Sequence, residues 1–183
     1  MKIKNTTTHY NSFSILLHWL MFILIVTVFG SIELRELFDK GTETRDALKM
    51  WHFMLGLSVL TLVGIRLVVR VLAGSTPAIK PEPAKWQNAL AKLVHLVLYV
   101  FMIAMPIAGW LILSMAGKAV PFFGLELPPL ASENKDLAKT IKEIHETVGE
   151  VGYYLIGLHA AAALFHHYIL ADNTLKRMLP IKK

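Results

Sequence analysis

The sequence contains no cysteine and few charged residues, and each shortage excludes a set of protein classes. Without cysteine there is no disulfide, iron–sulfur cluster, thiolate zinc site or covalently attached c-type haem. Charged residues make up 17% of the 183 positions and hydrophobic residues 55%. A soluble domain has about 25% charged and about 45–50% apolar residues. The composition therefore argues against a water-soluble globule and favours a membrane protein.

Four long apolar blocks are bounded by charged residues. A bilayer core about 30 Å thick requires roughly 20 apolar residues of helix, and such blocks lie at about residues 15–32, 51–72, 93–115 and 151–170. A helical pattern begins near Glu133 and continues without a breaker into the last block. The first block has a signal peptide as its alternative, although no A-x-A-like cleavage site follows it. The expected fold is an all-α integral membrane protein, one four-transmembrane-helix domain over residues 1–183 with a helical extension before the fourth span.

Lysine and arginine are distributed unevenly between the two sides of this topology. One side holds 11 of the 19 cations and two of the 13 acids. These cations are Lys2, Lys4, Arg66, Arg70, Lys80, Lys85, Lys92, Lys176, Arg177, Lys182 and Lys183. The positive-inside rule then predicts that both termini are cytoplasmic. The proline-containing connection 75–83 is expected to be an extended cytoplasmic linker, and 117–132 a loop at the outer interface.

The eight histidines are the main candidates for chemistry in a chain with so few ionisable groups. His145 and His159 are fourteen residues apart on the expected fourth helix. That separation falls about 40° short of four full turns and raises the helix by about 21 Å, so both imidazoles face the same way at two depths. Such a spacing is typical of a bundle that holds two stacked haems, each with a second histidine from a facing helix. His52 matches His145 in expected depth.

The inner partner is less well determined by spacing. His18 lies at the inner side, but His159 lies nearer the midplane. His166 turns only about 20° away from His159 and is closer in height to His18. His95 is a third inner candidate. Whichever pair forms, two histidine ligands on each iron leave no open position for oxygen. This predicts a protein that transfers electrons between its haems.

Four stretches around the histidines carry a family resemblance. They are LLHWLMF at His18, MWHFMLG at His52, HLVLYVFMIAMPIAGW in the third span, and HETVGEVGYYLIGLHAAAALFHHYILADNTLKRMLP from His145 onward. Together they resemble the bacterial cytochrome b561 family over nearly the whole chain. The resemblance implies a four-helix bundle in the bacterial inner membrane with two b-type haems. It implies His52 with His145 on the periplasmic side, and His18 with His159 on the cytoplasmic side.

The resemblance also implies a reaction and further site residues. In superoxide-oxidising members, superoxide becomes oxygen at the periplasmic face and the electron crosses through both haems to ubiquinone. An oxidoreductase of the superoxide:ubiquinone type is therefore expected, with no catalytic residue beyond the haems. His166 corresponds to a quinone-contacting histidine, and Lys80 is the nearest match to a quinone-side lysine, with a gap in register. Lys139 and Lys142 would draw the superoxide anion inward; their alternative is a solvated helix face balanced by glutamates.

Two other functions are compatible with the same pattern. A di-haem electron-transfer subunit would connect quinone with a hydrogenase- or dehydrogenase-type partner docked on the short loops. A haem-free protein would use its histidines for a transition metal. Arg66 and Arg70 are either topology signals or partners of haem propionates. On the leading interpretation membrane lipid surrounds the chain and no protein partner is required; without a recognition motif, the net charge of +6 does not indicate nucleic acid.

Overall fold

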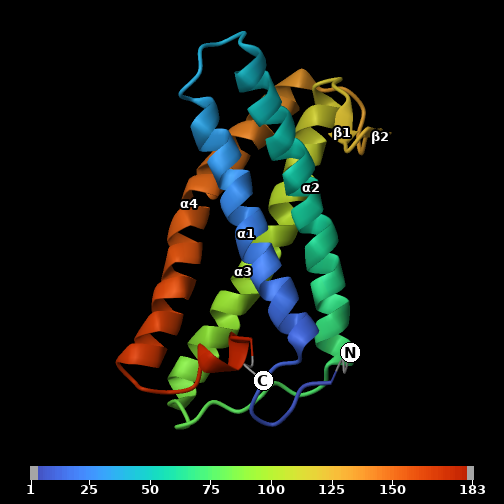
Figure 1. Cartoon of the computed structure of the whole chain (residues 1–183). Helices are drawn as coiled ribbons and strands as arrows, with labels where there is room; N and C mark the ends of the chain where they lie inside the picture. The colour runs from blue at the N-terminus through green and yellow to red at the C-terminus, as the bar shows by residue number, and fades with distance from the viewer. Residues whose placement is uncertain (1–3, 181–183) are drawn as a thin grey trace. The chain divides into compact units, whose positions relative to one another are not determined.

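The computed structural model describes residues 4–180, in which long helices predominate (Figure 1). The elements are α1 (Ser12–Arg35), α2 (Glu43–Leu72), α3 (Lys85–Met115), β1 (Val120–Phe122), β2 (Leu125–Leu127), α4 (Lys135–Tyr168) and the 3-10 turn η1 (Lys176–Met178). All four α-helices are long and apolar enough to cross a membrane, which confirms the predicted all-α membrane fold. Lys2, Lys182 and Lys183, used above for orientation, lie outside the described residues.

The chain divides into two compact units, and every α-helix contributes one part to each of them. We call them the His18 unit and the His52 unit. The His18 unit is formed by the described residues within Met1–Leu20, Gly64–Val100 and Val151–Lys183. The His52 unit comprises Met21–Val63 and Phe101–Glu150. The sequence predicts a single domain. This stays a prediction, because the chain divides into two units although each of the four helices belongs in part to both.

Polar caps begin the helices before their apolar stretches. The Asn11 side chain accepts a hydrogen bond from the Ser14 N–H at 2.8 Å, and the Asn134 side chain accepts one from the Leu137 N–H at 3.0 Å. Inside the bilayer the helix then satisfies its own backbone groups, since lipid offers no partners. Each helix is longer than its predicted apolar block, and α2, α3 and α4 gain their extra length at their polar N-terminal ends. The fourth ends at Tyr168, two residues before the predicted end of its span.

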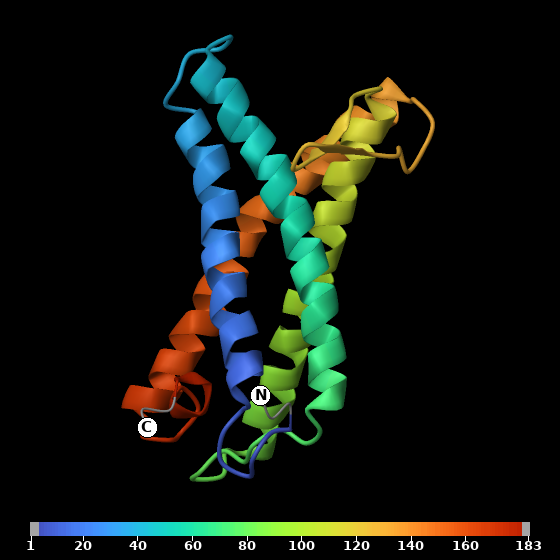
Figure 2. The ribbon, with the colours of Figure 1, turned by 45° about the vertical axis from the view of Figure 1, so that its right-hand side comes forward.

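The segment 117–132, expected to be a plain loop, contains a β-hairpin in the His52 unit. Phe122 pairs with Leu125, so the turn consists of Phe123 and Gly124, with φ of 47° and 84°. Two residues with positive φ are typical of a tight hairpin turn, and glycine adopts this conformation freely. Contacts of Phe123 with Met54 and Trp51 hold it in this conformation. The expected loop therefore contains two short strands that the sequence did not predict (Figure 2).

The hairpin packs onto the His52 unit through a small apolar core. Val120, Leu57 and Leu113 are buried there, with exposed fractions of 7% or less. Partly buried Phe53, Trp110, Phe122 and Leu127 surround them. Burial of these side chains from three parts of the chain fixes β1 against α2 and α3.

The linker of the His18 unit is tied to the C-terminal turn. Residues 75–83 form no helix or strand, as predicted. Arg177 is 8% exposed, donates a hydrogen bond to the Pro77 carbonyl and lies 5.7 Å from the centre of the Tyr10 ring. Figure 1 shows the N-terminal segment, the linker and η1 gathered at the same end of this unit. These contacts order a segment that sequence alone describes only as extended.

Candidate functional site

Two histidines face each other in the His52 unit. The ring centroids of His52, on α2, and His145, on α4, are 6.3 Å apart with ring planes at 80°. The Nδ1–H of His52 donates to the Val28 carbonyl at 3.1 Å. The Nδ1 atom of His145 is buried and has no hydrogen-bond partner. In the neutral His52 ring this arrangement leaves the Nε2 lone pair available to a metal.

A second pair with the same separation lies in the His18 unit. The centroids of His18, on α1, and His159, on α4, are 6.3 Å apart with ring planes at 65°. His95, on α3, lies nearer to His159, at 5.4 Å, and its Nδ1–H donates to the Ala91 carbonyl at 2.6 Å. His18 and His159 are half-buried, whereas His95 is exposed. The structure thus brings two of the three inner candidates to His159.

The ring separations discriminate between these candidates. A metal–imidazole bond is about 2 Å and the nitrogen lies about 1 Å from the ring centre, so two imidazoles on opposite sides of one iron stand about 6 Å apart. Both 6.3 Å pairs match this value. The 5.4 Å separation of His95 from His159 falls short of it. The geometry therefore favours His18 over His95 as the partner of His159.

Arg66 distinguishes His18 from the other candidate ligands. Its Nη2 donates to Nδ1 of His18 at 3.0 Å. Because a guanidinium has no acceptor, Nδ1 must accept this bond, which places the proton of the neutral ring on Nε2. Metal binding through Nε2 requires its lone pair, so the proton must move to Nδ1 and Arg66 must release that atom. Arg66, expected to be a topology signal or a propionate partner, thus contacts a candidate ligand.

His166 does not join these pairs but contacts an aspartate that sequence reasoning missed. Its Nδ1 lies 2.7 Å from Oδ2 of Asp172. Asn173, the residue after Asp172, forms hydrogen bonds with the backbone of Lys80, the other expected quinone residue. The structure therefore brings the chain at Lys80 and the chain after His166 together. The aspartate lies six positions after the histidine, a spacing that carries no distinctive signal in the sequence.

The lysines expected to attract superoxide have different surroundings. Lys142 forms an ion pair with Glu146 at 2.6 Å, with both side chains 56% exposed, which offsets its charge. Lys139 is exposed. Lys49, one turn before His52, was missed by sequence reasoning. The cations whose charges act on Lys49 are Lys118, Arg35 and Lys142.

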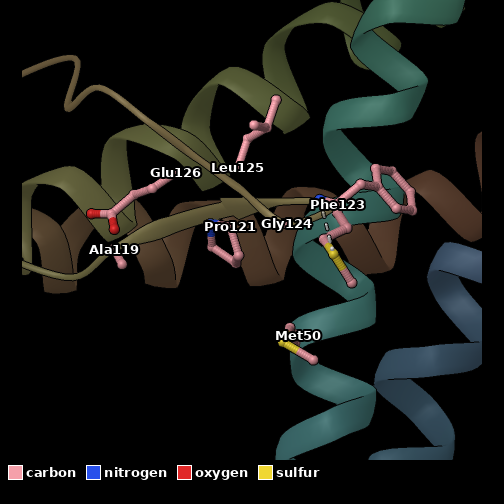
Figure 3. Close-up of a pocket in the computed structure, with 8 residues that line it drawn as sticks. Met50, Ala119, Pro121, Phe123, Gly124, Leu125 and Glu126 are labelled. Atoms are coloured by element: carbon pink, nitrogen blue, oxygen red, sulfur yellow. Dashed lines mark hydrogen bonds between the residues drawn. The ribbon is translucent and has the colours of Figure 1, made fainter.

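An open hollow lies between α2 and the hairpin (Figure 3). Its volume is about 520 Å³, and its lining includes Met50, Met54 and Phe123. The Phe123 N–H bonds the sulfur of Met54 at 3.4 Å, and the Phe123 ring lies 6.2 Å from Trp51. The eight lining residues include none of the residues predicted for a site. The hollow therefore coincides with none of the predicted sites.

The geometry defines a class of protein: a multi-pass membrane protein with paired imidazoles. Within residues 4–180, no group of three or more histidine, aspartate or glutamate side chains is arranged to hold a metal ion. The transition-metal alternative therefore lacks a three-residue site in the described part of the chain. Paired imidazoles instead suit an iron that already has four ligands from a porphyrin.

Comparisons with known proteins identify the family. The family model described as prokaryotic cytochrome b561 matches residues 9–180. The chain is 38% identical to "Cytochrome b561 homolog 1" of Escherichia coli (strain K12) over 174 residues, 95% of this chain and 98% of that protein. It is 40% identical to "Probable superoxide oxidase CybB" of Yersinia pestis over 174 residues, 95% and 97% of the two chains. It is 28% identical to "Cytochrome b561 homolog 2" of Escherichia coli (strain K12) over 183 residues, 98% and 95%. The chain belongs to the prokaryotic cytochrome b561 family.

Membership has consequences that agree with the geometry. The protein is a multi-pass membrane haem protein of a prokaryotic family that transfers electrons and carries b-type haem. Its residues fit that group: the donor set is imidazole, and both pairs have the spacing of two ligands on one iron. Because the chain has no cysteine, the porphyrin is held without thioether bonds.

Proposed function

We propose that this protein oxidises superoxide on one membrane face and reduces ubiquinone near the other, through two b-type haems with two histidine ligands each. The observation that carries the proposal is the repeated 6.3 Å pair, once in each unit and each time with a ring from α4. When bound, haem supplies one-electron redox chemistry at an iron whose axial positions are filled. The name of the relative from Yersinia pestis, "Probable superoxide oxidase CybB", supports the choice of donor.

Backbone groups of α1 and α3 orient the two histidines of the His52 unit. His52 and His145 would hold one haem, with Nδ1–H of His52 fixed on the Val28 carbonyl. A Cβ added at Gly109 would lie 3.7 Å from Cε1 of His145, so the backbone of α3 runs close beside that ring. Such support limits rotation of the imidazole and keeps it on the iron.

Positive charge near His52 would guide superoxide to this haem. Superoxide is an anion and needs no proton to give up its electron, so the chain has only to raise its local concentration. Lys49 and Lys118 supply positive charge, and Arg35 adds charge that its ion pair with Glu36 offsets in part. Lys139 and Lys142 remain candidates on the face of α4. By the positive-inside rule both termini would be cytoplasmic, and superoxide would react on the periplasmic side.

His18 and His159 would hold the second haem, and His166 would meet the quinone. His166 follows His159 by seven residues on one continuous helix, about 10 Å along its axis and about 20° around it. Ubiquinone arrives from the lipid, and exposed apolar residues such as Phe165 flank the histidine. Quinone reduction requires protons, which a histidine can supply at neutral pH. Lys80 would lie on the linker side of the same site.

Stopped-flow absorbance of the purified holoprotein in lipid tests the proposal. Mixing with superoxide should reduce the haems rapidly, and adding ubiquinone-1 should oxidise them again with a matching gain of ubiquinol. If superoxide leaves the haems oxidised while a quinol or a partner dehydrogenase reduces them, the protein is instead an electron-transfer subunit. A preparation without a b-type absorption band would contradict the haem assignment itself.

A further inference from the structure

A buried carboxylate lies directly beyond the last membrane helix. Asp172 is 4% exposed, and both of its oxygens are occupied. Oδ2 accepts from Nδ1–H of His166 at 2.7 Å, and Oδ1 accepts from the Thr174 N–H at 2.7 Å. Burial by itself raises the pKa of Asp172, but the hydrogen bonds from His166 and Thr174 outweigh it and hold the pKa below its ordinary value. Asp172 is therefore ionised at neutral pH.

The backbone places this carboxylate against His166 by a second contact. After α4 the chain reverses at Ala171, whose φ is +53°, a left-handed conformation that alanine rarely adopts. The Asp172 N–H then donates to the carbonyl of His166 at 3.0 Å. Main chain and side chain of Asp172 thus both bond to His166. A left-handed residue just past the last turn is a common way to end a helix, and here it turns the chain so that Asp172 reaches His166.

The next residue connects this turn with the linker. The side-chain oxygen of Asn173 accepts from the Lys80 N–H at 2.8 Å, and the Asn173 N–H donates to the Lys80 carbonyl at 3.1 Å. The Asn173 side chain also donates to the Ala78 carbonyl at 3.3 Å. Residues 172 and 173 therefore position both elements of the proposed quinone site, the histidine and the linker.

A carboxylate on Nδ1–H determines what the opposite ring nitrogen can do. With the proton of Nδ1 fixed on Asp172, Nε2 is the atom of His166 that gains or loses a proton. The His166 side chain is 20% exposed, so a ligand and water can reach the ring. An aspartate in this role keeps the imidazole in one tautomer and one orientation while it exchanges a proton.

We propose that Asp172 is the positioning residue of a proton-transferring pair, in which it holds Nδ1–H of His166 so that Nε2–H protonates a quinone carbonyl oxygen. The inference rests on the proposed function. Reduction of ubiquinone consumes two electrons and two protons, and the electrons come one at a time from two superoxide anions. In each protonation by this pair the N–H bond of His166 breaks and an O–H bond forms on the quinone. Water from the adjacent aqueous phase then returns a proton to Nε2.

The tautomer of His166 gives a test that needs no turnover. In fully reduced holoprotein labelled with 15N-histidine, neutral wild-type His166 should carry its proton on Nδ1. D172N should shift the ring toward the Nε2–H tautomer, and D172E should restore the Nδ1–H form at least in part. If His166 of the wild-type protein already has its proton on Nε2, the proposal is wrong, and this measurement does not depend on any variant folding.

Quinone kinetics give the second test. Protein reduced with dithionite is mixed with ubiquinone-1, and the saturating rate and the half-saturating concentration are measured. D172N and H166Q should lower the saturating rate about 10-fold or more with little change in half-saturation, and D172E should recover part of the loss. H167Q, at the neighbouring histidine whose ring contacts Tyr168, and D39N, in the exposed connection between α1 and α2, should match the wild type. Both haem bands should persist in all of these proteins.

The outcomes separate this inference from the proposed function. Because dithionite supplies the electrons, failure of superoxide to reduce the haems would contradict only the proposed donor. If ubiquinone-1 does not oxidise the reduced wild-type protein, the proposed acceptor and this inference both fail. If the wild type reacts with quinone and D172N reacts equally fast, only the role of Asp172 is overturned.

Discussion

The two histidine pairs have the same ring separation but different surroundings. In the His52 unit one Nδ1–H donates to a backbone carbonyl, the other Nδ1 has no partner, and the charges of three lysines and one arginine act on one another. In the His18 unit an arginine donates to one ring and a third histidine lies 5.4 Å from the other. That unit also contains a buried carboxylate bonded to a further histidine. Equal spacing with unequal surroundings is what the proposed function requires, with one haem in each unit and a different task for each.

The difference agrees with the chemistry proposed for each side. Taking an electron from superoxide requires no proton, so the His52 unit needs only access and positive charge. Reducing a quinone requires protons at a fixed place, and the His18 unit alone combines a histidine with an ionised carboxylate among the described residues. The comparison is therefore open to tests that change one unit and leave the other intact.

Removal of a ligand should have the largest effect on this comparison. His52→Ala should abolish one haem site and His18→Ala the other, each leaving about half of the haem, because each iron loses one of its two axial bonds. The pyridine haemochrome assay and reduced-minus-oxidised spectra measure the remaining content. His95→Ala is the matched variant, and it should keep both haems. Loss of the same haem in His95→Ala but not in His18→Ala would overturn the pairing that the 6.3 Å separation favours.

Removal of the arginine that contacts His18 should have a smaller effect, and it should change only the haem of the His18 unit. Arg66→Leu should lower the reduction potential of the haem in the His18 unit by roughly tens of millivolts, since a nearby cation stabilises the reduced, less positive iron centre. Redox titration of each haem band measures the shift. Arg70→Leu is the control, because Arg70 lies one turn away and its guanidinium lies 5.8 Å from the Tyr99 ring centre. Equal shifts in both haems would show that Arg66 acts only through overall charge.

Removal of charge near His52 should have the smallest effect. Lys49→Ala should lower the bimolecular rate of haem reduction by superoxide about two- to five-fold at low ionic strength, and it should weaken the dependence on salt. Stopped-flow traces at several salt concentrations measure both quantities. Lys40→Ala removes an exposed lysine from the connection between α1 and α2 and should change the rate less. Equal losses in the two variants would indicate that net charge, rather than the lysine beside His52, attracts the anion.

Much of the fold was predictable because apolar length and helical period are local properties of the chain. The four spans, the polar extension before the last one and the linker at 75–83 all follow from composition and spacing, and the structure agrees with them. The hairpin turn was not predictable, because nothing in the neighbouring sequence favours a positive φ for phenylalanine. Its contacts with Met54 and Trp51, about 70 residues earlier in the chain, stabilise this conformation.

The candidate site divides in a similar way. Helical periodicity placed His145 and His159 on one face, and the resemblance to the family supplied their partners. Neither periodicity nor the resemblance identified Asp172 and Lys49, since a carboxylate after a helix and a lysine before a histidine carry no distinctive signal. Their relation to the histidines depends on a chain reversal at Ala171 and on the packing of charges from several segments.

By itself, the sequence determined that this chain crosses a membrane in four helices and offers histidines at two depths, because both follow from residue type counted along a regular helix. Tertiary structure decided which histidines face one another at 6.3 Å, that Arg66 contacts one of them, and that Asp172 supports His166. These relations join residues from different helices and turns, and the spacing along a single helix carries no information about how neighbouring segments pack against it.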